Sequence, residues 1–311
     1  MTEARLGLLL CGAGRVVERL YGPALRRSRR VRAVAVVDPR EERRGWASRA
    51  LGVPAYASVA AALAAEKPDA AVVATPPAYH VEVASELLLA GLPVLIEKPA
   101  ARTAAEAAAL LAVAGELPLR VALSRRYWRH YQPRAAPNRV VASTGWAVEM
   151  MTPVGRWGAI EPAGERTTAD LLDDLLPHAY DIATSALAGD LSEVREARVD
   201  DSMVRLALAD GGVITLADGP GWRETVVGRG VSVEGCDWFL YGSRLTKGRA
   251  FVAGAARTAL ARAGVRTLEP VEAVARLLDD FAEDVRLGRR NDDLTRLARL
   301  FDAVREKLTE A

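Results

Sequence analysis

The chain has 311 residues, a length that suggests two domains and a core large enough to need no disulfide or metal to hold it together. Its 42 lysines and arginines nearly balance its 40 aspartates and glutamates, so the net charge of +2 excludes the broad basic surface of a nucleic-acid-binding protein. No apolar run approaches the roughly 18 residues of a membrane-spanning helix, and the distant cysteines Cys11 and Cys236 fit a reducing compartment. We therefore expect a cytoplasmic protein that binds neither nucleic acid nor membranes.

Short apolar segments alternate with amphipathic helical segments from residue 6 to residue 123. This alternation is typical of βαβ units, in which a parallel sheet is buried between two layers of helices. One helix, over 80–90, is expected to stop at Gly91, and another to begin at Thr103. We predict a doubly wound α/β domain over residues 1–123, with strands at 6–10, 31–37, 70–74, 93–96 and 119–123.

The second part of the chain has longer segments rich in Val, Thr, Trp and Gly, which are typical of antiparallel strands. We therefore predict an α+β substrate-binding and oligomerisation domain over residues 124–311. Its strands are expected at 139–151, 204–208, 213–216, 222–227 and 231–241, and its helices at 171–187, 271–287 and 292–308.

A glycine-containing turn follows the first predicted strand and precedes a helix. Gly12 permits the tight turn, and Gly14 lets backbone amides approach a pyrophosphate, but Val17 stands where a third glycine is usual. An ordinary glycine turn is therefore the alternative. Asp38 ends the second predicted strand, where a carboxylate binds the adenosine ribose and favours NAD. Arg40 follows closely and could neutralise the 2′-phosphate of NADP, so both cofactors stay open.

Further motifs in the first 100 residues make the chain recognisable. They are Gly12-x-Gly14, Val37-Asp38, Ala74-Thr75-Pro76-Pro77-x-x-His80, Ala90-Gly91 and Glu97-Lys98-Pro99. Their order and spacing resemble those of the glucose-fructose oxidoreductase, inositol dehydrogenase and MocA family. The resemblance implies an N-terminal Rossmann domain and a C-terminal domain with an open, mostly antiparallel sheet.

The resemblance also implies where a nicotinamide cofactor binds. Lys98 would lie beside the nicotinamide and the reacting carbon, while Glu97 and the backbone near Thr75 and Pro76 would hold the nicotinamide ribose. The alternative for Lys98 is a solvated surface lysine. The expected cofactor-binding residues are Gly12, Gly14, Arg15, Val16, Asp38, Arg40, Ala74, Thr75, Pro76, His80, Glu97 and Lys98.

A second signature, over residues 169–181, looks like the family's catalytic motif, and Asp174 and His178 are its matching pair. Four residues apart on a helix, they would share one face, so that the carboxylate could orient the imidazole as a proton acceptor. The alternative is an amphipathic helix whose polar residues face solvent. Leu176 and Pro177 depart from the motif, and a helix that kinks or begins at Leu176 would leave Asp174 outside it.

Three weaker candidates for contact with the substrate lie after the first domain. They are Arg126, Tyr127 and Trp157, and for each of them packing is an equal alternative. His130 lacks a motif and is expected to be a hydrogen-bonded structural histidine or a surface one. The three histidines of the chain show no metal-ligand spacing, so we predict no metal site.

The leading hypothesis is an NAD(P)-dependent dehydrogenase or reductase that moves a hydride between nicotinamide C4 and a secondary alcohol or ketone of a sugar, cyclitol or related small polyol. Lys98 and His178, oriented by Asp174, would carry the proton. Two alternatives are a redox-neutral, glycosidase-like enzyme that retains NAD, and a regulator that binds the dinucleotide without chemistry. We also expect a homodimer or homotetramer that forms through the C-terminal sheet.

Overall fold

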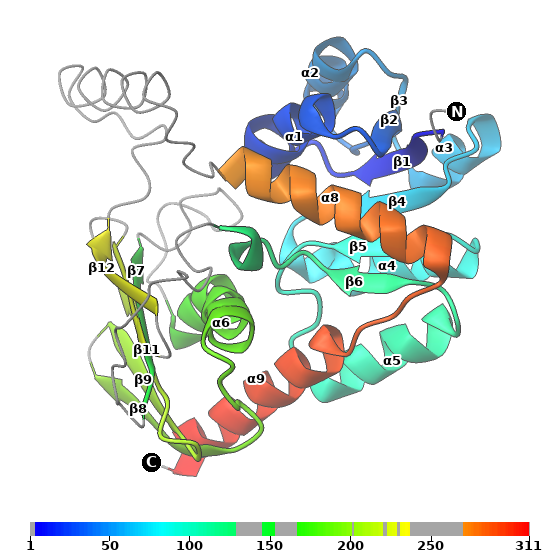
Figure 1. Ribbon diagram of the computed structural model, residues 1–311. Coiled ribbons are helices and arrows are strands. Elements are labelled where there is room, and N and C mark those ends of the chain that lie inside the picture. Colours follow the sequence, from blue (N-terminus) through cyan, green and yellow to red (C-terminus); the bar gives the residue numbers. More distant parts are fainter. Residues whose placement is uncertain are drawn as a thin grey trace, which may run out of the picture.

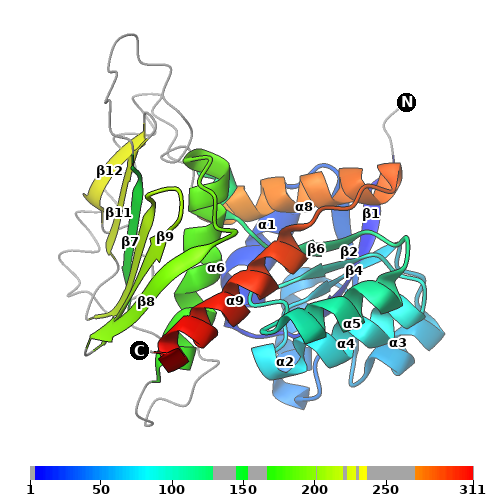
Figure 2. The ribbon, with the colours of Figure 1, turned by 90° about the horizontal axis from the view of Figure 1, so that it is seen from below.

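The computed structural model describes residues 4–128, 145–152, 167–200, 202–219, 223–228, 231–236 and 270–310. It contains two six-stranded sheets. Helix α6 (Thr168–Ala186) lies between the second sheet and the layers built on the first sheet (Figures 1 and 2). This arrangement confirms the predicted fold class.

The first sheet has the strand order β3-β2-β1-β4-β5-β6, and all its pairs are parallel. This order is that of a doubly wound sheet that binds dinucleotides at the carboxyl ends of its strands. The five predicted strands are confirmed, and the two-residue β3 was not predicted. The strands are β1 (Leu6–Cys11), β2 (Val31–Val37), β3 (Ala55–Tyr56), β4 (Ala70–Val73), β5 (Val94–Ile96) and β6 (Leu119–Val121).

Helices cover both faces of this sheet (Figure 2). They are η1 (Val17–Tyr21), α1 (Gly22–Arg27), α2 (Glu41–Leu51), α3 (Val59–Ala65), η2 (Pro77–Tyr79), α4 (His80–Leu89), α5 (Ala104–Ala114) and, late in the chain, α8 (Pro270–Leu287).

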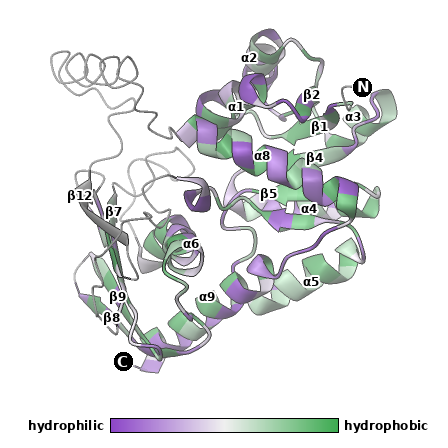
Figure 3. Ribbon diagram, viewed as in Figure 1, coloured by the Kyte–Doolittle hydropathy of each residue, from purple (hydrophilic) through white to green (hydrophobic). Residues whose placement is uncertain are grey.

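Side chains of β1 alternate between the two layers, as the pleat of a strand requires. Leu8 and Leu10 share an apolar cluster with Phe281 of α8, whereas Leu9 and Cys11 belong to the cluster that includes α4 and α5. In Figure 3, α8 accordingly carries both apolar and polar bands. Although α8 comes from the second part of the chain, it completes the core of the first sheet.

The second sheet has the order β12-β11-β7-β10-β9-β8, and its pairs are antiparallel except for β7 with β10. Its strands are β7 (Ala147–Thr152), β8 (Val194–Asp200), β9 (Met203–Leu208), β10 (Val213–Asp218), β11 (Arg223–Gly228) and β12 (Val231–Cys236). The sequence did not predict β8, because only Val194 and Ala197 of its seven residues are buried and four of the other five are charged.

The remaining helix, α9 (Asp293–Glu310), follows α8 and lies against both β8 and α5 (Figure 2). It therefore joins the second sheet to the helical layer of the first. No helix in the described ranges is long and apolar enough to cross a bilayer.

Candidate active site

The turn after β1 brings the chain into close contact with the end of β4. Gly12 has φ +101°, and a Cβ on it would lie 2.4 Å from the carbonyl oxygen of Ala74, so only glycine fits there. Gly14 differs, because no described atom lies within 4 Å of the place where its Cβ would be. Arg15 and Val16 open the helix that follows, with Arg15 exposed. The turn thus leaves open space beside Gly14, where the sequence predicts the pyrophosphate.

Asp38 follows β2 and is almost fully buried. It accepts hydrogen bonds from the Ala13 amide at 2.9 Å and from the amide and side chain of Arg40 at 3.0 and 3.1 Å. Burial alone would raise the pKa of Asp38, but these hydrogen bonds hold it below its ordinary value. Arg40 stays largely exposed, so a carboxylate and a cation stand together where the sequence predicts the adenosine ribose.

The loop after β4 presents Thr75, whose buried Oγ1 makes no hydrogen bond within the part of the chain that the structure describes. Behind it, His80 is buried, and its ring nitrogens lie 2.8 Å from the Thr75 carbonyl and 2.9 Å from the Pro99 carbonyl. Burial lowers the pKa of His80, so the neutral ring donates to one carbonyl at a time. His80 therefore links the loops that follow β4 and β5.

Glu97 follows β5, and each oxygen of its carboxyl group accepts a hydrogen bond. The hydroxyl of the buried Tyr21 donates to Oε1 at 2.7 Å, and the Lys98 amide donates to Oε2 at 3.1 Å. Burial raises the pKa of Glu97, while Tyr21 and Lys98 oppose the rise. These contacts fix the carboxyl group at the edge of the sheet where the resemblance implies the nicotinamide ribose.

Lys98 reaches from this loop to helix α6. Its Nζ donates to Oδ1 of Asp174 at 2.6 Å and to the backbone carbonyl of the same residue at 2.9 Å. The two side chains are 15% and 17% exposed. Lys98 is therefore a partly buried lysine, fixed by a residue 76 positions further along the chain.

Helix α6 is continuous from Thr168 through Pro177, with Thr167 and Asp170 forming a capping box at its start. It neither begins near Leu176 nor leaves Asp174 outside. Pro177 has no N–H, so the carbonyl four residues earlier, that of Asp173, loses its usual helical partner. Leu176 is fully buried in the core.

His178 lies one helical turn after Asp174, and its Nδ1 is inaccessible to solvent. Burial is the largest cause that lowers the pKa of His178 well below its ordinary value, and the positive charges of Lys98 and Arg125 add to it. The ring is therefore neutral at pH 7 and can accept a proton. Because the carboxylate of Asp174 is directed to Lys98, its predicted role in orienting His178 stays a prediction.

The geometry agrees with comparisons to known proteins. Residues 6–124 match the model of the GFO_IDH_MocA family, described as an oxidoreductase family with an NAD-binding Rossmann fold. The match spans the first sheet with the helices between its strands and covers less than half of the chain. Two curated relatives resemble it in sequence. The rhizopine catabolism protein MocA of Rhizobium meliloti is 35% identical over 134 residues, and an inositol 2-dehydrogenase of Leifsonia xyli subsp. xyli is 32% identical over 151 residues.

These matches cover 43% and 48% of the chain, and 40% and 43% of the two relatives, so the chain matches less than half the length of each. A solved structure, the myo-inositol 2-dehydrogenase of Lactobacillus plantarum, has a TM-score of 0.71 and 17% identity. The match covers 99% of this chain and 98% of that one, so the likeness in fold includes the second sheet.

Of the candidate substrate residues, Arg126 and Tyr127 form their hydrogen bonds and ion pairs with groups other than Lys98. Arg126 donates from Nε to Asp181 at 2.6 Å and also pairs with Asp293 at 3.1 Å, so it joins the segment after β6 to α6 and α9. Trp157 and His130 fall outside the described residues.

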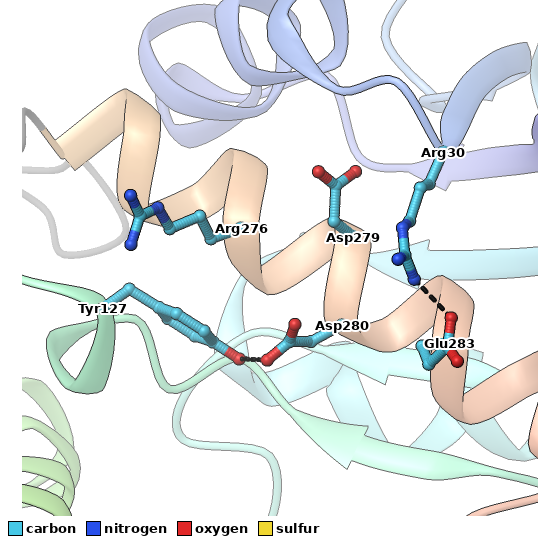
Figure 4. Close-up of a pocket in the computed structure, with 6 residues that line it drawn as sticks. All are labelled: Arg30, Tyr127, Arg276, Asp279, Asp280 and Glu283. Carbon is cyan, nitrogen blue, oxygen red and sulfur yellow. Dashed lines mark hydrogen bonds and ion pairs between the residues drawn. The ribbon is translucent and has the colours of Figure 1, made fainter.

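Tyr127 lies in η3 (Arg125–Tyr127) and faces α8. Its hydroxyl donates to Asp280 at 2.6 Å and accepts from Arg120 at 2.8 Å. The ring lines an open surface pocket of about 560 Å³, which Figure 4 shows beside α8. The pocket is lined by Arg30, Tyr127, Arg276, Asp279, Asp280 and Glu283, and by none of the three catalytic candidates.

Two residues near the site were not predicted from the sequence. Arg125 and Glu224 of β11 form an ion pair at 2.9 Å, and both side chains are almost completely buried. A glutamate two residues before the apolar Val226, on the same face of the strand, was the available signal, but its partner lies far away in the sequence. Within the described ranges, no group of histidine, cysteine and acidic residues could hold a metal ion.

Proposed function

We propose that this protein is an NAD(P)-dependent oxidoreductase acting on a secondary alcohol or ketone. The observation that carries the proposal is the double contact of Lys98 with Asp174, with His178 one turn further along the same helix. Lys98 follows β5, next to the crevice at the carboxyl ends of β1 and β4. Proton carriers at this edge of a doubly wound sheet fit a hydride transfer, which needs a proton to move as well.

The residues present fit a nicotinamide dinucleotide. Gly14 leaves room for backbone amides to meet a pyrophosphate, Asp38 can accept from ribose hydroxyls, and the buried Thr75 Oγ1 offers a hydrogen-bonding group to the ligand. When bound, the nicotinamide ring accepts or supplies the hydride. Asp38 supports NAD as the preferred cofactor, and Arg40 allows NADP.

Lys98 is suited to bind the oxygen of the substrate. An ammonium group has three N–H donors, and the two contacts to Asp174 use two of them. The third can donate a hydrogen bond to the alcohol or carbonyl oxygen in both directions, which stabilises the negative charge that develops there. The proton can pass between this oxygen and either Lys98 or His178, and it returns in reduction by the route it took in oxidation. Asp174 holds the group in place during either direction.

His178 is suited to exchange the proton with the substrate oxygen in both directions. Its lowered pKa keeps the imidazole neutral at pH 7, so it can take the hydroxyl proton of the alcohol during oxidation. Lys98 and Arg125 make the imidazolium unfavourable, which helps the ring return the proton.

We infer the substrate class from the names of two relatives in sequence. One is named as an inositol 2-dehydrogenase and the other as a rhizopine catabolism protein, and both names fit a small polyol. We infer a sugar, cyclitol or related polyol, or the corresponding keto compound, as the substrate of this chain.

We also infer that the chain divides functionally near residue 123 and assembles as a homodimer or homotetramer. The second sheet is covered by α6 on one face, and residues such as Met151, Thr215 and Val227, which alternate with buried ones, are only partly buried. Sedimentation of the purified protein tests this. A monomer at working concentration would contradict it.

The function is tested by following nicotinamide absorbance with NAD(H) and NADP(H) against a panel of sugars, inositols and keto-sugars. We expect turnover with at least one polyol or keto-sugar, and its loss in Lys98→Met with dinucleotide binding kept. Lys67→Met, at an exposed lysine after α3, is the matched control and should behave like the unchanged protein. Undiminished turnover in Lys98→Met would overturn the assignment of Lys98. Failure to bind either dinucleotide would overturn the function.

A further inference from the structure

A hydrogen bond connects the helical segment after the glycine turn with the loop that carries Lys98. Tyr21 ends η1, a single turn of π-helix, and its side chain is fully buried. Its hydroxyl donates to Oε1 of Glu97 at 2.7 Å, across 76 positions of sequence. In the sheet, β4 lies between β1 and β5. The contact therefore joins the segments that follow two strands which are not neighbours.

The carboxyl group of Glu97 can accept more hydrogen bonds than the two it has. The Lys98 amide donates to its other oxygen at 3.1 Å, and each carboxylate oxygen has a second lone pair. Burial and the charge of Glu97 raise the pKa of Tyr21 well above its ordinary value, so the phenol keeps its proton and stays a donor. Glu97 is thus fixed by two donors and still able to accept from the hydroxyl groups of a ligand.

Glu97 stands where the nicotinamide half of a dinucleotide is expected. It directly precedes Lys98, and its own amide donates to the Val73 carbonyl at the end of β4, at 2.8 Å. Thr75, whose buried Oγ1 makes no hydrogen bond among the described residues, lies in the adjoining loop. A cofactor with its reacting carbon near Lys98 has a ribose next to that carbon, and ribose hydroxyls are donors that suit a carboxylate.

We propose that Tyr21 is a positioning residue, which holds the Glu97 carboxylate in place to accept hydrogen bonds from the nicotinamide ribose. The inference rests on the proposed function, because it needs a nicotinamide dinucleotide in this crevice. Without the hydroxyl of Tyr21, Oε1 of Glu97 would keep no hydrogen bond from the described residues. The carboxyl group would then be less well fixed and would take up a proton more readily.

The test compares ligands that share ADP and differ in the nicotinamide half. ADP lacks the nicotinamide ribose, ADP-ribose has it, and NAD carries the ring as well. In Tyr21→Phe, which removes a single oxygen atom, we expect the dissociation constants of ADP-ribose and NAD to rise about fivefold and that of ADP to stay the same. Calorimetric titration measures all of them without turnover. If NADP binds more tightly than NAD, the 2′-phosphorylated forms of the same ligands are used.

A second tyrosine and glutamate pair provides the matched control. The hydroxyl of Tyr56 in β3 donates to Oε1 of Glu66 at the same distance, 2.7 Å. Tyr56→Phe removes the same atom from this other pair and should leave every dissociation constant unchanged. A double-mutant cycle tests the route of the effect. If Tyr21 acts through Glu97, then Tyr21→Phe has no further effect on ADP-ribose affinity in the Glu97→Ala background.

The protonation of Glu97 gives an independent readout. With isotope-labelled glutamate carboxyl groups, the NMR signal of Glu97 is the one that is missing in Glu97→Ala. Burial raises the pKa of Glu97, and Tyr21 from η1 and Lys98 from the same loop lower it. Tyr21→Phe leaves Lys98 and its partner Asp174 in place, so it should raise the titration midpoint by on the order of one pH unit. An unchanged midpoint would overturn the inference.

The ligand series separates positioning from a general loss of structure. Equal weakening of ADP, ADP-ribose and NAD in Tyr21→Phe would overturn the inference, and so would a loss confined to NAD, because the ribose would then not be the group that Glu97 holds. If the unchanged protein binds NAD and Tyr21→Phe binds it equally well, the inference fails and the proposed function stands. If the unchanged protein binds neither dinucleotide, the proposed function fails and the inference falls with it.

Discussion

The cofactor end of the first sheet and the catalytic face of α6 are assembled in different ways. The first is built from loops that follow neighbouring strands, with Gly12, Asp38 and Thr75 coming after β1, β2 and β4. The second depends on contact between the two layers, because Lys98 meets Asp174 only when α6 packs beside the sheet. Changes at one end should therefore alter dinucleotide binding, and changes at the other should alter proton transfer.

The largest effect is expected at the catalytic face. Lys98→Arg keeps a cation that can pair with Asp174, but arginine, with a pKa above about 12, cannot carry a proton. We expect kcat to fall by about 10³-fold while the dissociation constant for the dinucleotide stays the same. Steady-state kinetics and a fluorescence titration measure the two quantities. A variant that keeps its kcat would show that Lys98 only binds and orients.

The next largest effect should differ between the two glycines of the turn after β1. Gly12→Ala would place a Cβ 2.4 Å from the Ala74 carbonyl oxygen at a φ of +101°, so the free energy of unfolding should fall by about 3 kcal/mol. Gly14→Ala meets no described atom within 4 Å, so stability should hold while dinucleotide affinity falls. Urea denaturation and calorimetric titration compare the variants. Equal loss of stability in both would contradict the different roles.

A smaller effect concerns the choice of cofactor. Asp38→Ala removes the carboxylate expected to bind ribose hydroxyls, and we expect NAD affinity to fall about tenfold. Arg40→Ala should weaken NADP binding by a similar factor and leave NAD binding unchanged, because it removes only the cation that can pair with the 2′-phosphate. Dissociation constants for both dinucleotides test this pair. An equal loss of affinity for NAD and NADP in Arg40→Ala would show that Arg40 does not discriminate between the two cofactors.

The smallest effect is a pH dependence. Oxidation requires neutral His178, and its pKa is lowered well below 6.5, so its contribution to kcat/KM is lost only as the pH falls through that lowered pKa. Between about pH 6.5 and 7.5 this group should cause almost no change in kcat/KM for oxidation. An acidic limb with a midpoint above 6.5 that disappears in His178→Asn would contradict the neutral ring.

The sequence predicted the parallel sheet well, because its longer strands are mostly apolar and each is bounded by a turn or a helix. Val31–Val37 was predicted to the residue. The strands β3 and β8 were not predicted, because β3 has only two residues and β8 is mostly charged, so neither shows a clear apolar pattern. The parallel pairing of β7 with β10 is also a long-range feature, which alternation along one strand does not reveal.

In the candidate site, too, local features could be predicted from the sequence and long-range contacts could not. Gly12, Asp38 and Lys98 carry local signals, since each follows a recognisable strand. The partner of Lys98 is Asp174 rather than solvent, and α6 continues through Pro177 because the helix is stabilised by packing on both sides of the proline. The Arg125–Glu224 pair could not be predicted, because an ion pair between residues so far apart in the sequence leaves no characteristic spacing.

Because α8 packs on the first sheet but lies late in the chain, it affects how the protein can fold during synthesis. Phe281 and its neighbours complete a core that begins with Leu8, and Asp279 accepts a hydrogen bond from Ser28 across 251 residues of chain. On the ribosome, all six parallel strands emerge long before the helix that covers one of their faces. The nascent sheet must therefore wait, with apolar side chains exposed, until almost the whole polypeptide has been made.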